Sequence, residues 1–346
     1  IITKDSQSNT DRAGNLAAQL IHKDEVDLLL VQDSLSSITA ADQGELNGVP
    51  TISTMMPWQA WMFPRKGDPA VGFEWSYHFF WGIEDVIGAY KEIWTSVETN
   101  KKLGGIYSAD PGGEAFGSPD FGIPAALKTM GFGYVGTGKF QEGSSDFSPQ
   151  IAKFKTEGVD IIAGHAHVPD FTTFWAQAAQ QKLEPKVVTI AAALLFPSGL
   201  EAQGDRGDGL TTEVWWTPNF PYKSTLTNQS AADLSAQYEN ETGKQWTQPL
   251  GYAHAIWEIG VEALKRAGDP HNREAVRDVL KTMKMDTIVG NINWADTPIK
   301  NVAKTKVVGG QWRLGGKHKY QLLITNNGSA PNIPVQAEVK LMNELN

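Results

Sequence analysis

The fold class is indicated by one stretch near the start of the chain, residues 26–54, VDLLLVQDSLSSITAADQGELNGVPTIST. Its first part, Val26 to Val31, is a short apolar run of the kind that is buried on both faces of a parallel sheet. Polar residues 32–34 follow, and the pattern then predicts a helix over 37–47 and a strand over 49–54. Two strands joined by a helix through short connections predict a doubly wound α/β sheet with right-handed crossovers.

The rest of the chain continues this alternation. Apolar residues at helical spacing predict a helix around 13–21 and a longer one over 83–97. A second set of short strands and helices follows, so the sequence predicts two similar α/β halves. Strands are expected at 105–108, 134–136, 159–163, 186–191, 305–312 and 320–324, and helices at 121–130, 147–157, 171–182, 231–242, 252–267 and 273–283.

Length and composition exclude several classes of protein. A chain of 346 residues with 41% apolar and 20% charged positions is longer than one hydrophobic core usually serves, which favours two domains. The net charge of −9 argues against binding to nucleic acids or to anionic membranes. The longest apolar stretch, 187–196, is about half of the roughly 20 residues that cross a bilayer. The chain contains no cysteine, which excludes disulfides and thiolate metal sites.

Short signatures are spread along nearly the whole chain. They are Asp5-Ser6, Leu20-Ile21, Val26 to Leu30, Gly48 to Ser53, Asp110, Phe116-Gly117, Gly158 to Ile162, Tyr252 to Gly268 and Ile288 to Trp294. None is specific alone. Their order and spacing resemble the type I periplasmic binding proteins of the branched-chain amino acid and amide ABC transporter family, the group of the Leu/Ile/Val-binding protein.

This resemblance implies two doubly wound, Rossmann-like lobes that are joined by three hinge crossovers and close on a ligand. We expect an N-terminal lobe of residues 1–104 plus 222–298 and a C-terminal lobe of 105–221 plus 299–346. The resemblance also implies a monomeric, non-enzymatic receptor without a cofactor, which delivers a small-molecule ligand to the membrane permease subunits of an ABC importer. Such a receptor would be periplasmic or extracellular, either free or lipid-anchored.

One part of the family pattern is absent from the sequence. In the family a strand and a helix precede the segment that begins here at Ile1, and that strand lies in the middle of the first sheet. A sheet without it would expose unpaired backbone edges, so by family analogy we expect roughly 50 further residues upstream in the natural protein.

Ligand contacts from the first lobe are expected after its strands, because ligands of open α/β sheets bind beyond the carboxyl ends of the strands. Ser34, followed by Leu35, matches the family serine whose hydroxyl holds the ligand's carboxylate. Met55 and Met56 match the contribution of the next strand. The alternative is that Ser34 and its neighbouring serines only cap a helix.

Ligand contacts from the second lobe are expected at Phe116, His165, His167 and Ala192. Phe116 matches a family aromatic residue, and either His167 or Val168 falls where another aromatic residue is usual. Ala192 lies at the end of the strand after which family members that hold an α-amino group carry a carboxylate.

That carboxylate is missing here, because residues 190–195 contain no acid. An ammonium group buried without a partner costs several kcal/mol, which favours a ligand that lacks an amino group. Asp33, Glu114 or Asp170 could replace the missing acid, so a branched-chain amino acid, another amino acid or an amide is the alternative ligand.

An aromatic segment follows the strand at 49–54. It contains Trp58 and Trp61 and continues with Phe73, Trp75, Tyr77, Phe79, Phe80 and Trp81. Packing of these rings onto their own domain is the favoured interpretation. If Trp58 instead lines the ligand site, its flat ring would favour a planar or bulky apolar ligand.

His165 and His167 form a His-x-His pair at the end of an expected strand, which places both imidazoles on one face as in zinc hydrolases. The remaining histidines are scattered, and no further cluster of ligands has a suitable spacing relative to this pair. We therefore expect no metal centre, and a metal-assisted hydrolase that uses His165 and His167 is the alternative function.

Overall fold

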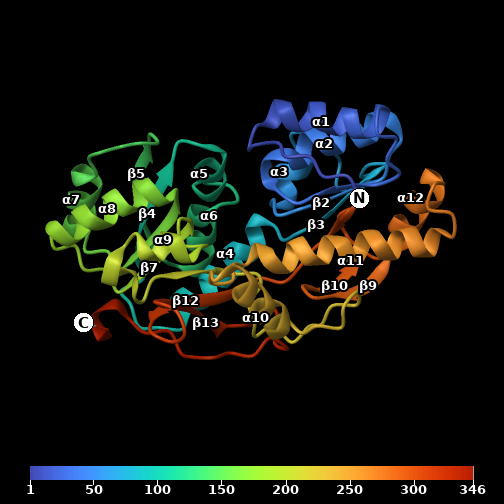
Figure 1. Cartoon of the computed structure of the whole chain (residues 1–346). Coiled ribbons are helices and arrows are strands. Elements are labelled where there is room, and N and C mark those ends of the chain that lie inside the picture. The colour runs from blue at the N-terminus through green and yellow to red at the C-terminus, as the bar shows by residue number, and fades with distance from the viewer. Residues whose placement is uncertain (346) are drawn as a thin grey trace. The chain divides into compact units, whose positions relative to one another are not determined.

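The computed structural model describes residues 1–345, which form two compact units, each with its own β-sheet (Figure 1). The first unit consists of Ile1–Gly82 and Trp216–Lys306. The second consists of Ile83–Trp215 and the described residues from 307 onward. Within residues 1–345, no helix is both long enough and apolar enough to cross a membrane.

The elements of the first unit include the predicted helices and strands as well as short elements that the sequence does not predict. They are α1 (Thr10–His22), β1 (Leu29–Val31), α2 (Ser34–Asn47), β2 (Thr51–Thr54), α3 (Trp58–Met62), β3 (Ser76–Phe79), α10 (Ala231–Thr242), α11 (Pro249–Ala267), α12 (Arg273–Thr282), β9 (Lys284–Thr287), β10 (Gly290–Asn293) and β11 (Val302–Ala303).

In the described residues of the first unit, four parallel strands form a sheet in the order β1-β2-β3-β11. Helices α1 and α2 lie on one side of this sheet and α11 on the other (Figure 1). α2 approaches β2 closely at Gly44, where a Cβ would lie 2.0 Å from Thr51 Oγ1. Side chains that α1, α2 and β1 bury together include Ala17, Ile21, Leu29 and Ala40.

Within residues 1–345, β1 lies at one edge of this sheet and pairs with β2, where Leu29 lies opposite Thr51. The expectation of a further strand and helix upstream stays a prediction.

The second unit contains the second alternation of strands and helices. Its elements are α4 (Ile83–Thr95), β4 (Lys102–Ser108), α5 (Pro111–Phe116), α6 (Ile123–Met130), β5 (Gly133–Phe140), α7 (Ser148–Glu157), β6 (Ile161–Ala166), α8 (Val168–Gln180), β7 (Val187–Ala192), α9 (Pro197–Glu201), η1 (Gly204–Gly207), β8 (Thr211–Val214), β12 (Val308–Leu314), β13 (Tyr320–Asn326) and η2 (Met342–Glu344).

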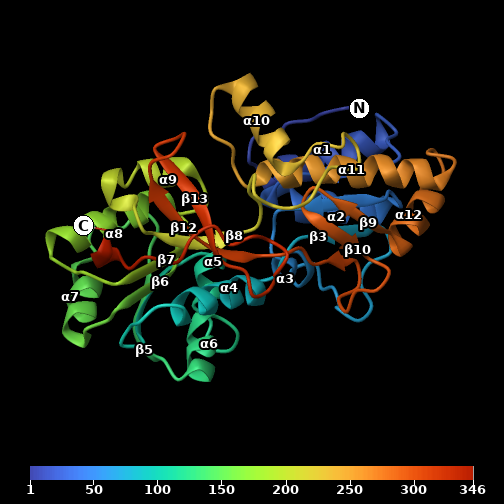
Figure 2. The same ribbon diagram turned by 90° about the horizontal axis from the view of Figure 1, so that it is seen from below.

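The described strands of the second unit form a seven-stranded sheet in the order β13-β12-β8-β7-β6-β4-β5. The pairs from β5 to β8 are parallel, while β12 is antiparallel to β8 and to β13. Helices α7 and α8 cover one face of this sheet, and α4 and α6 cover the other (Figure 2). This arrangement is the one that right-handed crossovers produce.

The compact units divide the chain at different residues from those expected for the lobes. The expected N-terminal lobe of 1–104 includes α4, which the structure places in the second unit. α4 packs on β8, β12 and β13, and Trp94 Nε1 donates a hydrogen bond to Thr189 Oγ1 at 3.0 Å. At the other end, β11 pairs with β3 and so extends the first unit to Lys306 instead of 298.

A buried hydrogen bond also holds α4 in the second unit. The hydroxyl group of Tyr90 donates to the Glu213 carboxyl group, to which the Thr212 hydroxyl donates as well. Tyr90 and Glu213 are fully buried or nearly so, and burial raises the pKa of Glu213. Loss of a donor to this buried group therefore carries a desolvation penalty.

We expect Tyr90→Phe to lower the free energy of unfolding by about 1–3 kcal/mol, because Glu213 loses one of its donors. Denaturant unfolding followed by circular dichroism measures the effect. Tyr238→Phe, which removes a half-buried hydroxyl from α10, is the control and should change stability by less than about 0.5 kcal/mol. Equal stability of the two variants would contradict a stabilising role for the hydrogen bond from Tyr90 to Glu213.

A second buried polar group lies in β3. His78 is fully buried; its Nε2 donates to the Met56 carbonyl oxygen at 2.8 Å, and its Nδ1 lies 2.9 Å from Ser53 Oγ. Burial lowers the pKa of His78 to about 3, although the hydrogen bond to Met56 opposes this effect. The folded protein therefore holds this imidazole neutral under ordinary conditions.

His78 makes the stability of the protein depend on pH with a defined sign. An unfolded histidine binds a proton below about pH 6.5, whereas folded His78 does not until about pH 3, so stability falls as pH decreases through this window. His78→Asn should reduce the slope of unfolding free energy against pH by up to about 1.4 kcal/mol per pH unit near pH 5. His22→Asn, at an exposed position, should leave the slope unchanged. Parallel slopes for wild type and His78→Asn would refute the prediction.

Candidate functional site

Ser34 lies where β1 ends and α2 begins. The helix is capped by Asp33, whose Oδ1 accepts a hydrogen bond from the Ser36 backbone N–H at 2.8 Å. The Ser37 hydroxyl donates to the Asp33 carbonyl oxygen at 2.6 Å. Ser34 is exposed, and its hydroxyl makes no hydrogen bond within residues 1–345. The residue that caps this helix is therefore Asp33 and not Ser34. The Ser34 hydroxyl is available to a ligand, and the neighbouring Leu35 side chain is also exposed.

Met55 and Met56 follow β2, which is the neighbour of β1 in the sheet. Met55 has a φ of 62°, a left-handed conformation that costs free energy for a residue other than glycine. The hydrogen bond from His78 fixes the Met56 carbonyl. The Ser37 hydroxyl, in the helix that follows β1, donates a hydrogen bond to the carbonyl oxygen of Thr54, the last residue of β2, at 3.3 Å. This bond ties the segment after β1 to the end of β2. The structure thus brings the candidates after β1 and β2 to one edge of the sheet.

Trp58 begins α3 and is half-buried. Its ring packs edge-on against Phe63, with ring centroids 5.5 Å apart. The other rings of the aromatic segment are mostly interior: those buried are Trp61, Tyr77, Phe79, Phe80 and Trp81. The packing interpretation is therefore confirmed for these five residues.

In the second unit, Phe116 and His165 are packed together in the interior. Phe116 is 5% exposed and His165 is 8% exposed, and their rings stack with centroids 5.6 Å apart. His165 Nδ1 lies 3.0 Å from the Ser108 hydroxyl, and a Cβ added to Gly112 would lie 2.3 Å from His165 Nε2. Burial lowers the pKa of His165 to about 4, against the opposing effect of Asp110, so this ring is neutral at pH 7.

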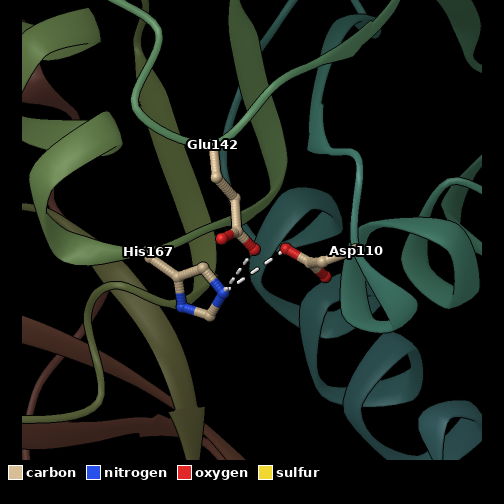
Figure 3. A group of neighbouring side chains, drawn as sticks. All are labelled: Asp110, Glu142 and His167. Carbon is tan, nitrogen blue, oxygen red and sulfur yellow. Dashed lines mark ion pairs between the residues drawn. The ribbon is translucent and has the colours of Figure 1, made fainter.

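His167 has different surroundings from His165. Its side chain is 51% exposed, and its Nε2 lies 3.3 Å from Asp110 Oδ2 and 3.6 Å from Glu142 Oε1. Figure 3 shows the three side chains pointing toward one another. Their ligand atoms all lie within 4.8 Å of one another. The structure thus corrects the expectation that no further metal-type ligands accompany the His-x-His pair.

The three residues of this Asp110–Glu142–His167 cluster follow β4, β5 and β6 directly or after one residue. These strands are parallel neighbours, so their carboxyl ends meet at one edge of the sheet. Asp110 also caps α5, because its Oδ1 accepts a hydrogen bond from the Gly113 backbone N–H at 2.8 Å. Although burial opposes the effect, hydrogen bonds from Ser108 and Gly113 hold the pKa of Asp110 below its ordinary value. Asp110 is therefore a carboxylate at neutral pH.

Ala192 is the last residue of β7, which is the next strand after β6 in the sheet. It lies opposite Ala166 and has a φ of 66°. The structure thus places Ala192 one strand away from His167, at the same edge.

The three acids named as replacements for the missing carboxylate have other partners. Asp33 caps α2, Glu114 forms an ion pair with Lys139, and buried Asp170 accepts a hydrogen bond from the Gly143 backbone N–H at 2.8 Å. The acids that approach His167 are instead Asp110 and Glu142, and sequence reasoning named neither as a site residue. Asp110 follows the strand expected at 105–108, and this position was the available signal. Glu142 lies well beyond the expected strand end at 136, because β5 continues to Phe140, so the sequence offered no such signal for it.

Comparison with known proteins supports this fold assignment. Residues 1–317 match the family described as periplasmic binding protein. The chain is similar to a leucine-binding protein from Thermotoga maritima, with 20% identity and a TM-score of 0.71 over 94% of this chain and 87% of that one.

Two further solved structures are similar at comparable levels. One is a solute-binding protein of an ABC transporter from Rhodopseudomonas palustris in complex with 3,4-dihydroxybenzoic acid, with 18% identity and a TM-score of 0.70 over 95% of this chain and 88% of that one. The other is a branched-chain amino acid transporter substrate-binding protein from Streptococcus pneumoniae in complex with isoleucine, with 16% identity and a TM-score of 0.67 over 98% and 86% of the respective chains. The match over residues 1–317 and the two α/β units show that this chain belongs to the periplasmic binding protein family.

Proposed function

We propose that the protein is an extracytoplasmic solute-binding receptor of an ABC importer, and that it binds a small carboxylate-bearing ligand without changing it chemically. Family membership supports the receptor role, and so do similar proteins that are described as substrate-binding components of ABC transporters. The proposed partners are the permease subunits of such an importer in the membrane. The residues proposed for ligand contact are Ser34, Leu35, Met55, Met56 and Trp58 in the first unit, and Phe116, His165, His167 and Ala192 in the second.

The single observation that carries this proposal is the free Ser34 hydroxyl at the N-terminus of α2. This helix runs from Ser34 to Asn47, so its aligned peptide dipoles place partial positive charge at the end where Ser34 lies. The first backbone N–H groups of a helix have no partner within the helix. A ligand carboxylate at this position would accept hydrogen bonds from both the hydroxyl and the backbone.

The body of the ligand is proposed to be aromatic or bulky and apolar. Apolar surface around the carboxylate position comes from half-buried Trp58 and from the side chains of Leu35, Met55 and Met56. The bound 3,4-dihydroxybenzoic acid in the Rhodopseudomonas palustris relative is an aromatic carboxylate and supports this choice of class. Buried Phe116 would act chiefly by supporting the His165 ring on which it stacks.

A branched-chain or other amino acid is the second candidate ligand, and one observation favours it. Asp110 and Glu142 supply carboxylates beside His167, at the edge of the second sheet where an α-amino group would need a counter-charge. The leucine-binding and isoleucine-bound relatives belong to this ligand class. A ligand panel must therefore contain both aromatic carboxylates and aliphatic amino acids.

We expect calorimetric titration of the full chain to give saturable heat with at least one member of such a panel. Ser34→Ala should then weaken the best ligand by about 10- to 100-fold, because a hydrogen bond to a charged group is worth about 1.5–3 kcal/mol. The expected ranking places aromatic carboxylates above leucine and isoleucine.

Ser36→Ala is the matched control on the same helix. Its hydroxyl is buried and lies 3.2 Å from Ser6 Oγ, so its removal should leave ligand affinity unchanged. Absence of saturable heat with every carboxylate would count against the receptor role. Equal affinity of Ser34→Ala and wild type would remove Ser34 from the site.

A further inference from the structure

We propose that the second unit binds one divalent transition-metal ion, of the class of Zn²⁺, between Asp110 Oδ2, Glu142 Oε1 and His167 Nε2. This inference concerns residues of the second unit alone. It does not depend on the proposed transport role or on the identity of an organic ligand.

The spacing of the three ligand atoms fits a small cation. Zinc binds nitrogen and oxygen at about 2.0–2.2 Å, which places neighbouring ligand atoms of a tetrahedral site about 3.4 Å apart. The distances from His167 Nε2 to Asp110 Oδ2 and Glu142 Oε1 are 3.3 and 3.6 Å. Two of the three separations thus match a tetrahedral metal site, and the ligand atoms of all three residues lie within 4.8 Å of one another.

The donor set also points to a transition metal. Imidazole nitrogen is a ligand of zinc, copper, iron and nickel, whereas calcium and magnesium are held by oxygen alone in most protein sites. Two carboxylates and one neutral imidazole carry a charge of about −2, which a divalent ion neutralises. The chain has no cysteine, so a nitrogen and oxygen site of this kind is the type of transition-metal site that its side chains can build.

Asp110 provides an observation that is independent of the spacing. Its side chain is only 11% exposed, and its Oδ2 atom is buried without a hydrogen bond among residues 1–345. The other oxygen, Oδ1, is held by the Gly113 N–H at the start of α5, which fixes the orientation of the carboxylate. This oxygen forms an ion pair with His167 Nε2 at 3.3 Å but no hydrogen bond within the described residues, and a metal ion at the cluster would coordinate it directly.

The remaining ligands leave the site accessible from one side. The side chains of Glu142 and His167 are 56% and 51% exposed, so an ion can enter from solvent and water can complete its coordination. His165 is not part of the proposed site, because its ring is buried between Phe116 and Gly112 and its Nδ1 faces Ser108. The site therefore differs from the His165–His167 pair suggested by the sequence.

Titration of the metal-free full chain with Zn²⁺ alone, in competition with a chromogenic chelator, tests this proposal. We expect one ion per chain. Asp110→Asn, Glu142→Gln and His167→Gln should each weaken binding at least about tenfold, since each removes a direct ligand. Asn also caps helices well, so Asp110→Asn should retain the cap of α5. With Co²⁺ as a second probe, visible absorption bands should appear in wild type and be lost in His167→Gln.

His271→Gln is the matched control. His271 is an exposed histidine in the first unit whose Nδ1 lies 2.9 Å from Asp27 Oδ2, so it resembles His167 in pairing with a carboxylate, but no third ligand group joins this pair among residues 1–345. This variant should bind Zn²⁺ as wild type does. Failure of wild type to bind Zn²⁺ saturably would overturn the proposal and leave the cluster as an ion pair. Unchanged binding in the three cluster variants, or equal loss in His271→Gln, would overturn it as well.

Discussion

Parallel pairing of strands determines where the functional side chains lie. In the second unit, Ser108 of β4 lies opposite Phe140 of β5, and Tyr107 lies opposite His165 of β6. Because these strands run in the same direction, the residues that follow them reach the same edge although they are far apart in sequence. In the first unit, Val31 lies opposite Ser53, which brings the Ser34 and Met55 segments to one edge in the same way. A slip of one residue would turn each side chain to the opposite face.

Buried hydrogen bonds then fix the orientation of the side chains at these edges. Asp110 both caps α5 and presents its second oxygen toward His167, and His78 holds the Met56 carbonyl from within β3. His165 is neutral and enclosed, and exposed His167 lies two residues further along the chain. Two histidines that look equivalent in the sequence therefore have different surroundings: His165 is enclosed, whereas the His167 side chain is half exposed.

Much of the fold could be predicted from the sequence, because apolar runs such as Val26 to Val31 and the stripe of α4 reflect burial directly. The structure confirms two α/β units and most expected elements. The prediction ended β5 at residue 136, whereas this strand continues to Phe140. β5 is an edge strand with many exposed residues, so it lacks the apolar signal of an inner strand. For that reason Glu142 was not recognised as following a strand. β3 was missed because Ser76 and His78 are polar, yet both are buried with hydrogen-bond partners.

The central claim is that ligand-binding residues lie at the carboxyl edges of the parallel strands. Hydrogen exchange measured by mass spectrometry, with and without the best ligand of the panel, tests this claim most directly because it reports on every segment in solution. The account predicts slower exchange in residues 32–36 and 55–58 of the first unit and in residues 110–117 and 165–168 of the second. Protection confined to other parts of the chain would contradict it.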